Sequence, residues 1–120
     1  MRSFGEKRDF EGLARVYRQT AENLAQAGIA MNLAPVVDVV THPEIGYLKP
    51  RTFGDEPFIV SQMAACAVEA LHSGGVFACA KHFVALGDSA KDPHELLPVS
   101  NASKEKLEVA FFPPFCAAIE

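Results

Sequence analysis

The sequence has few cysteines, no long hydrophobic run and no basic cluster, and each absence excludes a class of protein. Its three cysteines, Cys66, Cys79 and Cys116, lie inside apolar segments of the 120 residues. An odd number of cysteines outside paired turns argues against a disulfide framework. We therefore expect three small buried thiols and a reducing compartment.

The sequence contains no membrane-spanning segment and no secretory leader. No apolar run approaches the length that crosses a bilayer. The residues that follow Met1, Arg2-Ser-Phe-Gly-Glu-Lys-Arg8, lack the apolar core of a signal peptide. We expect a soluble cytoplasmic protein without a membrane partner, although a truncated start would leave a secreted or periplasmic location open.

The composition is that of a small globular domain with a slightly acidic surface. Hydrophobic residues make up 49% of the chain, which allows one core of modest size. The 11 Lys and Arg residues are outnumbered by 15 Asp and Glu residues. Because no basic cluster is long enough to neutralise a row of phosphates, we expect no nucleic-acid partner.

The first half of the chain predicts a helix, a strand and a long loop. Apolar residues recur every three or four positions from Phe10 to Ala27, and Gly28 follows where a helix would stop. Residues Ile29 to Val40 form a near-continuous apolar run rich in β-branched residues, as expected of a strand covered on both faces. Thr41 to Asp55 is loop material with His42-Pro43, Pro50 and two glycines, and its length suggests a function.

The second half repeats this alternation. Glu56-Pro57 opens a helix that ends at Gly74-Gly75, and Val76 to Phe83 is a second buried-strand candidate. After a polar loop, Ser103 can cap a short helix from Lys104 to Ala110, and Phe111 to Glu120 is the start of another helix. Alternating helices and strands predict a parallel α/β sheet, open or closed into a barrel. In both versions polar chemistry gathers at the carboxyl ends of the strands.

The loop after the second strand contains Asp92-Pro93-His94. Proline favours an extended conformation for the residue before it, and in an extended segment residues two apart point to the same side. The Asp92 carboxylate can therefore lie beside one imidazole nitrogen of His94 and leave the other nitrogen free to pass a proton. A surface histidine beside a solvated aspartate is the alternative that the tripeptide alone favours.

Lys81-His82 and Arg51 are candidates for binding substrate oxygens. An ammonium is costly to bury without a partner, and the ends of strands in this architecture open into a polar cleft. Lys81 could equally pair with a carboxylate for structural reasons. Arg51 could bind oxygens with both arms of its guanidinium, or hold its own loop to Asp55.

Other chemistries have weaker support. Six side chains are plausible metal ligands: His42, His82, His94, Asp38, Asp88 and Asp92. No His-Glu-Xaa-Xaa-His or Cys-Xaa-Xaa-Cys spacing accompanies them, so we expect no metal. Phosphate-loop spacing and a Gly-Xaa-Ser-Xaa-Gly elbow are also absent. Arg-Xaa-Phe-Gly occurs at residues 2–5 and 51–54, but two copies of four residues do not establish a repeat.

Several short motifs follow one another in a fixed order. They are Asn32-Leu-Ala-Pro-Val-Val-Asp-Val39, Arg51-Thr-Phe-Gly-Asp-Glu-Pro57, Lys81-His-Phe83, Gly87-Asp-Ser89, Asp92-Xaa-His94, Leu97-Pro98, and Pro114-Phe115 with Ala118-Ile119. From about Ala21 onward they resemble the N-terminal barrel domain of family 3 glycoside hydrolases, in particular the β-N-acetylglucosaminidase branch. The fold that this resemblance implies is α/β, part of a (β/α)8 TIM-type barrel with parallel strands and alternating helices.

The resemblance implies a retaining glycosidase that acts on β-linked N-acetylglucosamine or related β-glycosides and needs no cofactor. Asp92 and His94 would be the acid/base dyad, and Arg51, Lys81 and His82 would bind sugar hydroxyls. An aspartate would attack the anomeric carbon while the histidine protonates the leaving oxygen and then activates water. The partner implied is an amino-sugar glycoside.

Two features set this chain apart from that pattern. The family's Pro-Gly-His after Lys-His-Phe is Val84-Ala85-Leu86 here, and the Ser of its Asp-Ser-His is Pro93. We expect these changes to stiffen or redirect the loop that carries the dyad. The nucleophile lies downstream of these motifs in the family, and a whole barrel needs about 250 residues. Residues 1–120 are therefore expected to be a single partial domain, the central βα units of the barrel.

Two alternatives stay open. A partial barrel exposes the sides of its strands, so the chain could be a non-catalytic carbohydrate-binding or assembly-forming relic that self-associates through those edges. An unrelated α/β enzyme, such as a metal-dependent aldolase or hydrolase, would require activity that a chelator abolishes.

Overall fold

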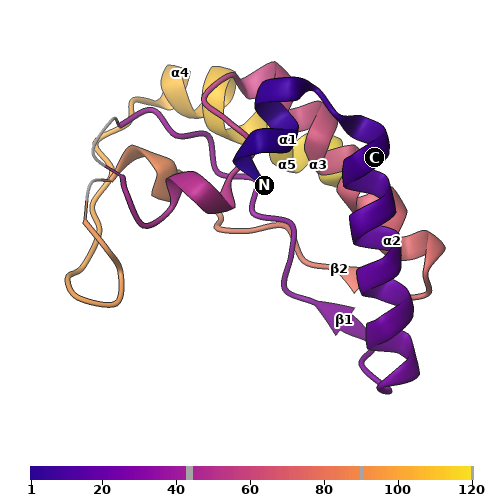
Figure 1. The fold of residues 1–120 in the computed structure, drawn as a ribbon. Coiled ribbons are helices and arrows are strands. Elements are labelled where there is room, and N and C mark those ends of the chain that lie inside the picture. Colours follow the sequence, from indigo (N-terminus) through magenta and orange to yellow (C-terminus); the bar gives the residue numbers. More distant parts are fainter. Residues whose placement is uncertain (43–44, 90, 120) are drawn as a thin grey trace.

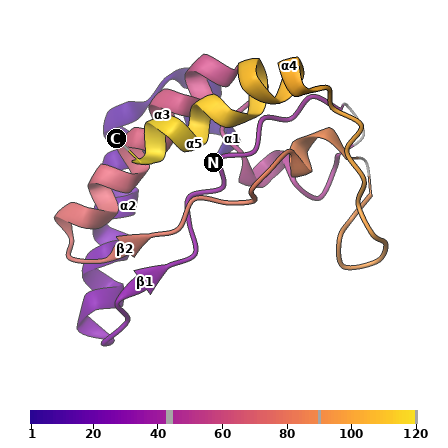
Figure 2. The same cartoon turned by 180° about the vertical axis from the view of Figure 1, so that it is seen from behind.

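The computed structural model describes residues 1–42, 45–89 and 91–119. Pro43 of the predicted loop and Glu120 of the predicted last helix lie outside these ranges. Its elements are α1 (Arg2–Lys7), α2 (Phe10–Gln26), β1 (Met31–Asn32), α3 (Pro57–Ser73), β2 (Phe77–Ala78), α4 (Lys104–Lys106) and α5 (Phe112–Ile119). Figures 1 and 2 show β1 and β2 side by side, with the loop that contains Asp92 protruding far from them. One core cluster joins α2, α3, α5 and one face of the strand segments.

The two long helices agree with the sequence pattern. Helix α2 begins after Asp9, whose side chain accepts a hydrogen bond from the Gly12 N–H at 2.8 Å. Helix α3 begins at Pro57, where a missing N–H costs nothing. Both helices bury one stripe against each other, and a Cβ added at Gly74 would overlap Ala21 of α2. These two predictions are confirmed.

The two strands are parallel, as predicted, but regular pairing is short. Met31 pairs with Phe77 and Asn32 with Ala78, an offset of 46, whereas Val36 forms an isolated bridge with Lys81, an offset of 45. The first strand therefore holds one extra residue between these pairs. The Cys79 N–H donates to both the Asn32 and the Ala34 carbonyl oxygens, at 3.0 and 2.9 Å, where two residues oppose one. This bulge breaks the strand predicted from Ile29 to Val40.

The prediction that the first strand is covered on both faces is wrong for its first half. Ile29, Met31, Leu33 and the paired Phe77 are 44%, 51%, 61% and 65% exposed. Alternating residues of a strand point to the same side, so these side chains share one face of the strand pair. No element within residues 1–42, 45–89 and 91–119 covers that face.

The C-terminal part is one helical run rather than two helices. Helix α4 passes into a π-helical segment, Leu107–Phe111, and then into α5. The predicted cap is confirmed, because Ser103 Oγ accepts a hydrogen bond from the Lys106 N–H at 3.2 Å. The expectation of three buried thiols is wrong: Cys66 and Cys79 are half-buried, and Cys116 is exposed on α5. No helix in the described ranges is both long and apolar enough to cross a bilayer.

Helix α1 was not predicted. Its Arg-Ser-Phe-Gly sequence lies against the second copy of that pattern, since a Cβ added at Gly5 would overlap the Phe53 carbonyl oxygen. The two segments of similar sequence therefore touch each other, but they do not form a structural repeat.

Candidate active site

A buried carboxylate orients one of the predicted binding residues. The Asp38 side chain is 1% exposed, and its Oδ2 accepts a hydrogen bond from the His82 backbone N–H at 3.0 Å. The His82 ring places Nδ1 2.8 Å from the same oxygen. Since an ionised carboxylate can only accept, Nδ1 carries the proton and Nε2 points away from Asp38. The other oxygen, Asp38 Oδ1, is buried without a partner among the described residues.

The predicted dyad is formed, by a different backbone geometry from the one expected. Asp92 Oδ1 accepts a hydrogen bond from the His94 N–H at 2.9 Å and lies 2.8 Å from His94 Nδ1. The Asp92 carbonyl also accepts from the N–H groups of Glu95 and Leu96. The segment is therefore a turn that begins at an aspartate, not an extended strand. These hydrogen bonds, first from the His94 N–H and then from its ring, lower the pKa of Asp92.

Arg51 is exposed at the end of a 3₁₀ turn, Lys49–Arg51. Its positive charge lowers the pKa of Asp92 and also acts on the phenol of Tyr47. The alternative in which Arg51 holds its own loop to Asp55 is wrong, because Asp55 Oδ2 accepts its hydrogen bond from Arg2 Nη2 at 2.8 Å. Arg51 is therefore available to a ligand.

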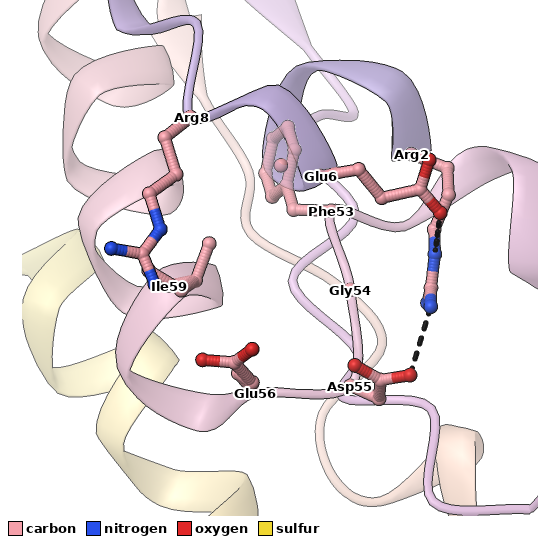
Figure 3. A pocket seen from close by; sticks show the side chains of 9 residues that line it. Arg2, Glu6, Arg8, Phe53, Gly54, Asp55, Glu56 and Ile59 are labelled. Carbon is pink, nitrogen blue, oxygen red and sulfur yellow. Dashed lines mark hydrogen bonds and ion pairs between the residues drawn. The ribbon is translucent and has the colours of Figure 1, made fainter.

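Helix α1 holds the Arg51 loop in place. Figure 3 shows Arg2 of α1 between Glu6 and Asp55, with Phe53 behind them and a pocket of about 140 Å³ between the two segments. The hydrogen bond from Arg2 is the main reason that the pKa of Asp55 lies below its ordinary value. Residues 53–55 thus depend on a segment some fifty positions away in the sequence.

Lys81 lies at the end of the second strand segment. Its N–H donates to the Pro35 carbonyl at 3.0 Å, and its own carbonyl accepts from the Val37 N–H at 2.8 Å. Within residues 1–42, 45–89 and 91–119 no carboxylate lies within ion-pair distance of its ammonium group, so the structural pairing considered above is not found. Beside it, a pocket of about 310 Å³ is lined by both His82 and Pro93.

Asp88 closes the base of the loop that carries the dyad, residues 91–99, which we call the dyad loop. Its Oδ1 accepts from Thr41 Oγ1 at 2.9 Å and from Lys106 Nζ, and its Oδ2 accepts from Ser100 Oγ at 2.8 Å. Burial alone would raise the pKa of Asp88, but these hydrogen bonds hold it below the ordinary value. One carboxylate thus joins the end of the first strand to both ends of the dyad loop.

Acidification is expected to release this anchor. Because the pKa of Asp88 is lowered in the folded state, its contribution to stability is present above the ordinary value, about 3.8, and is lost as the pH falls through the lower folded value. The protection of the Thr41 amide, which donates to the Gly87 carbonyl, should fall as the pH drops below about 3.8. Hydrogen exchange measured by NMR checks this.

The Val37 amide, bonded to the Lys81 carbonyl, is the internal reference and should keep its protection in the same pH range. In Asp88→Asn, Thr41 protection should already be low at neutral pH and no longer respond to acid. Glu108→Gln removes an exposed carboxylate that forms an ion pair with Lys104 and not with the dyad loop. This variant should behave as the parent chain. Equal acid responses of Thr41 and Val37 would contradict the prediction.

A metal centre is not assembled by the described residues. No group of three or more His, Cys, Asp or Glu side chains in this part of the chain has a geometry that could hold a metal ion. Asp38, Asp88 and Asp92, all considered as ligands, are instead hydrogen-bonded to His82, to Lys106 and to His94.

The site residues therefore lie in the loops after two parallel strands and carry two carboxylate–imidazole pairs. The family model of the glycosyl hydrolase family 3 N-terminal domain matches residues 1–120, the whole chain. The chain belongs to glycosyl hydrolase family 3. It is 30% identical to β-hexosaminidase A of Pseudoalteromonas piscicida over 106 residues, which are 88% of this chain and 18% of that protein.

Solved family 3 structures share the fold. A β-N-acetylglucosaminidase from Paenibacillus sp. FPU-7 is 30% identical with a TM-score of 0.93, over 98% of this chain and 22% of that one. NagZ of Neisseria gonorrhoeae, solved with N-trifluoroacetyl-D-glucosamine, is 30% identical with a TM-score of 0.83, over 90% of this chain and 31% of that one. The α/β fold is thus part of the family's parallel barrel, and the chain spans less than a third of each of these relatives.

Within the family 3 chain, the segment that differs from the expected pattern is well packed. Ala85, where the pattern of this family has glycine, adopts the left-handed conformation with φ 67° and is buried. Glycine adopts this conformation without a steric penalty, whereas alanine does not. Ala85 therefore occupies a backbone conformation that glycine adopts more readily, and the expected change in the loop stays a prediction.

The sequence analysis gave no site role to three side chains that the structure connects to the candidate site residues or to the loop that carries them. Asp38 was considered only as a metal ligand, although a lone acid within Val-Val-Asp-Val-Val must find a buried partner, and this signal was available. Asp88 appeared only as a possible metal ligand and as part of a motif. Tyr47 had no local signal, because its contacts lie 44 positions away.

Proposed function

We propose that this chain supplies the sugar-binding residues and the acid/base dyad of a retaining β-N-acetylglucosaminidase. The contact that carries the proposal is between Asp92 Oδ1 and His94 Nδ1, at 2.8 Å, because it leaves Nε2 free to exchange a proton. Relatives of this chain are named β-hexosaminidases, and the Neisseria NagZ structure contains an amino-sugar derivative.

The proposed reaction has two steps. In the first, an aspartate outside these 120 residues attacks the anomeric carbon while His94 Nε2–H protonates the leaving glycosidic oxygen. In the second, neutral His94 removes a proton from water as the water attacks the glycosyl-enzyme ester, which restores both groups. Asp92 keeps the proton on Nδ1 and thereby holds Nε2 ready to give or take a proton.

Arg51, Lys81 and His82 bind the sugar hydroxyls in this proposal. The guanidinium of Arg51 and the Lys81 ammonium donate to hydroxyl oxygens, and neither has a carboxylate partner in the described ranges. His82 presents Nε2, while Asp38 fixes its ring. A carbohydrate with several hydroxyls and an acetamido group fits this donor-rich edge. We also propose that the protein is cytoplasmic, as expected from the sequence.

A panel of aryl glycosides tests the function. We expect the β-N-acetylglucosaminide to be hydrolysed at least about a hundredfold faster than its α-anomer or the corresponding β-glucoside, since polar sites reject ligands that leave buried groups unpaired. NMR should detect the β-anomer of the released sugar first, which identifies retention. The assay uses this chain and the longest natural polypeptide that contains it. Faster hydrolysis of the β-glucoside, or release of the α-anomer first, would contradict the proposal.

A second candidate is a binding or assembly-forming relic. The observation that favours it is the exposed apolar face formed by Ile29, Met31, Leu33 and Phe77. Apolar faces of this kind are interaction surfaces when they are contiguous. The relic should form dimers or larger species in sedimentation at micromolar concentration, bind the amino sugar and release no aglycone. Turnover by the chain would exclude it.

A further inference from the structure

Among the described residues, one side-chain hydrogen bond joins the dyad loop to a distant part of the fold. Within residues 91–99 the hydrogen bonds run from Lys91 to Ser89 at the base of the loop, and from His94, Glu95 and Leu96 back to Asp92. The one hydrogen bond that the described structure gives from this segment to another part of the fold is donated by Tyr47. Its hydroxyl lies 3.1 Å from the Lys91 carbonyl oxygen.

Packing does not compensate for this small number of contacts. Leu96, Leu97 and Val99 are exposed, and the His94 side chain is 82% exposed. The turn at Asp92 fixes the dyad internally but not its position relative to the strand ends. That position depends on the base of the loop at Asp88 and on the hydroxyl of Tyr47.

Tyr47 is influenced by both carboxylate–imidazole pairs. It is half-buried in the loop that also carries Arg51. Burial and the negative charges of Asp92 and Asp38 raise the pKa of its phenol, whereas Arg51 lowers it. One side chain is therefore within electrostatic reach of both aspartates and of the arginine.

We propose that Tyr47 is a positioning residue that holds the dyad loop over the sugar-binding residues through its hydrogen bond to the Lys91 carbonyl. The bonded carbonyl immediately precedes Asp92, so the hydroxyl fixes the start of the turn on which His94 sits. Tyr47 acts through the dyad and transfers no proton itself. The proposal deepens the proposed function, on which it rests for its effect on catalysis.

Loss of the hydroxyl should loosen the loop without unfolding the protein. Tyr47→Phe keeps the ring and removes only the donor, and the dyad contacts within residues 92–94 stay intact. Amide order parameters of residues 91–97 should fall below about 0.6, the range of flexible segments. Tyr17→Phe makes the same chemical change in α2, which is remote from the site, and should leave these order parameters unchanged.

The catalytic consequence separates positioning from a general structural role. In the longest active natural polypeptide that contains this chain, Tyr47→Phe should lower kcat about ten- to hundredfold, because small misplacements of a catalytic group are costly. KM should change less than about threefold. The loss should be larger for an aryl glycoside with a poor leaving group, which needs the His94 proton, than for a dinitrophenyl glycoside. A general loss of folding would affect both substrates equally.

Each outcome decides the proposal. Unchanged order parameters in Tyr47→Phe, or an equal fall in Tyr17→Phe, would overturn it, as would equal losses on the two leaving groups. If even the parent protein hydrolyses neither glycoside, the proposed function has failed, and the order parameters alone still decide whether Tyr47 holds the loop.

Discussion

Replacing His94 with alanine is expected to lower kcat for a β-N-acetylglucosaminide with a poor leaving group by about 10²–10⁴-fold, the usual contribution of a general acid/base. Its ring is the group of the dyad that can donate a proton, since Asp92 accepts hydrogen bonds from His94 N–H and Nδ1, and these lower the pKa of Asp92. The assay measures the steady-state release of an aryl group by the longest active natural polypeptide that contains this chain.

The leaving group shows whether His94 acts as an acid. A dinitrophenyl group departs without protonation, so the first step in His94→Ala should be nearly as fast as in the parent and product should appear as a burst. His72→Ala, a change at an exposed histidine in the last turn of α3, serves as the matched control and should retain full activity. Equal losses of kcat/KM, which reports the first step, on both leaving groups, or parent-like activity on both, would remove His94 from the role of acid.

Gly87→Ala is expected to produce the largest loss of stability. A Cβ at this position would overlap the Val39 carbonyl oxygen and carbonyl carbon, and backbone atoms cannot rotate away as a side chain does. The Gly87 carbonyl also accepts the Thr41 N–H at 3.0 Å. We expect a cost of about 3 kcal/mol, at the upper end for overpacking, and a fall in Tm of about 10–20 °C, measured by circular dichroism.

Gly46→Ala is the matched control for this change. A Cβ at Gly46 meets nothing within 4 Å, and its backbone is not in the left-handed region. Its free energy of unfolding should change by no more than about 0.5 kcal/mol, as for most surface substitutions. Its Tm should therefore stay close to that of the parent chain. Similar Tm values for the two variants would show that Gly87 is not in contact with the first strand.

The sequence predicted those parts of the fold that depend on local patterns. Helices α2 and α3 follow apolar stripes, with Gly28 as a stop signal for the first and Pro57 as a start signal for the second, and Ser103 was recognisable as a cap. The parallel pairing followed from the order of the elements. The bulge at Ala34 was not predictable, because it depends on how Cys79 meets two carbonyl groups of the other strand.

The candidate site was predicted as a set of residues but not as a network. The contact of Asp92 with His94 is local, so the tripeptide indicated it, although the turn differs from the predicted extended segment. Asp38 with His82 and Tyr47 with Lys91 each join positions 44 apart. Such contacts depend on how the strands and loops pack together, and a single sequence contains no direct record of them.

The extra residue in the first strand determines which side chains reach His82. Before it, the odd-numbered Met31 and Leu33 point to the open face, and after it the odd-numbered Val37 and Val39 lie in the helix-covered core. The even-numbered Asp38 consequently meets His82. Deleting one residue at Ala34 or Pro35 would reverse the parity of the rest of the strand, because side chains alternate with a period of two. Asp38 would then point into the apolar core, and a valine would occupy the place beside the imidazole.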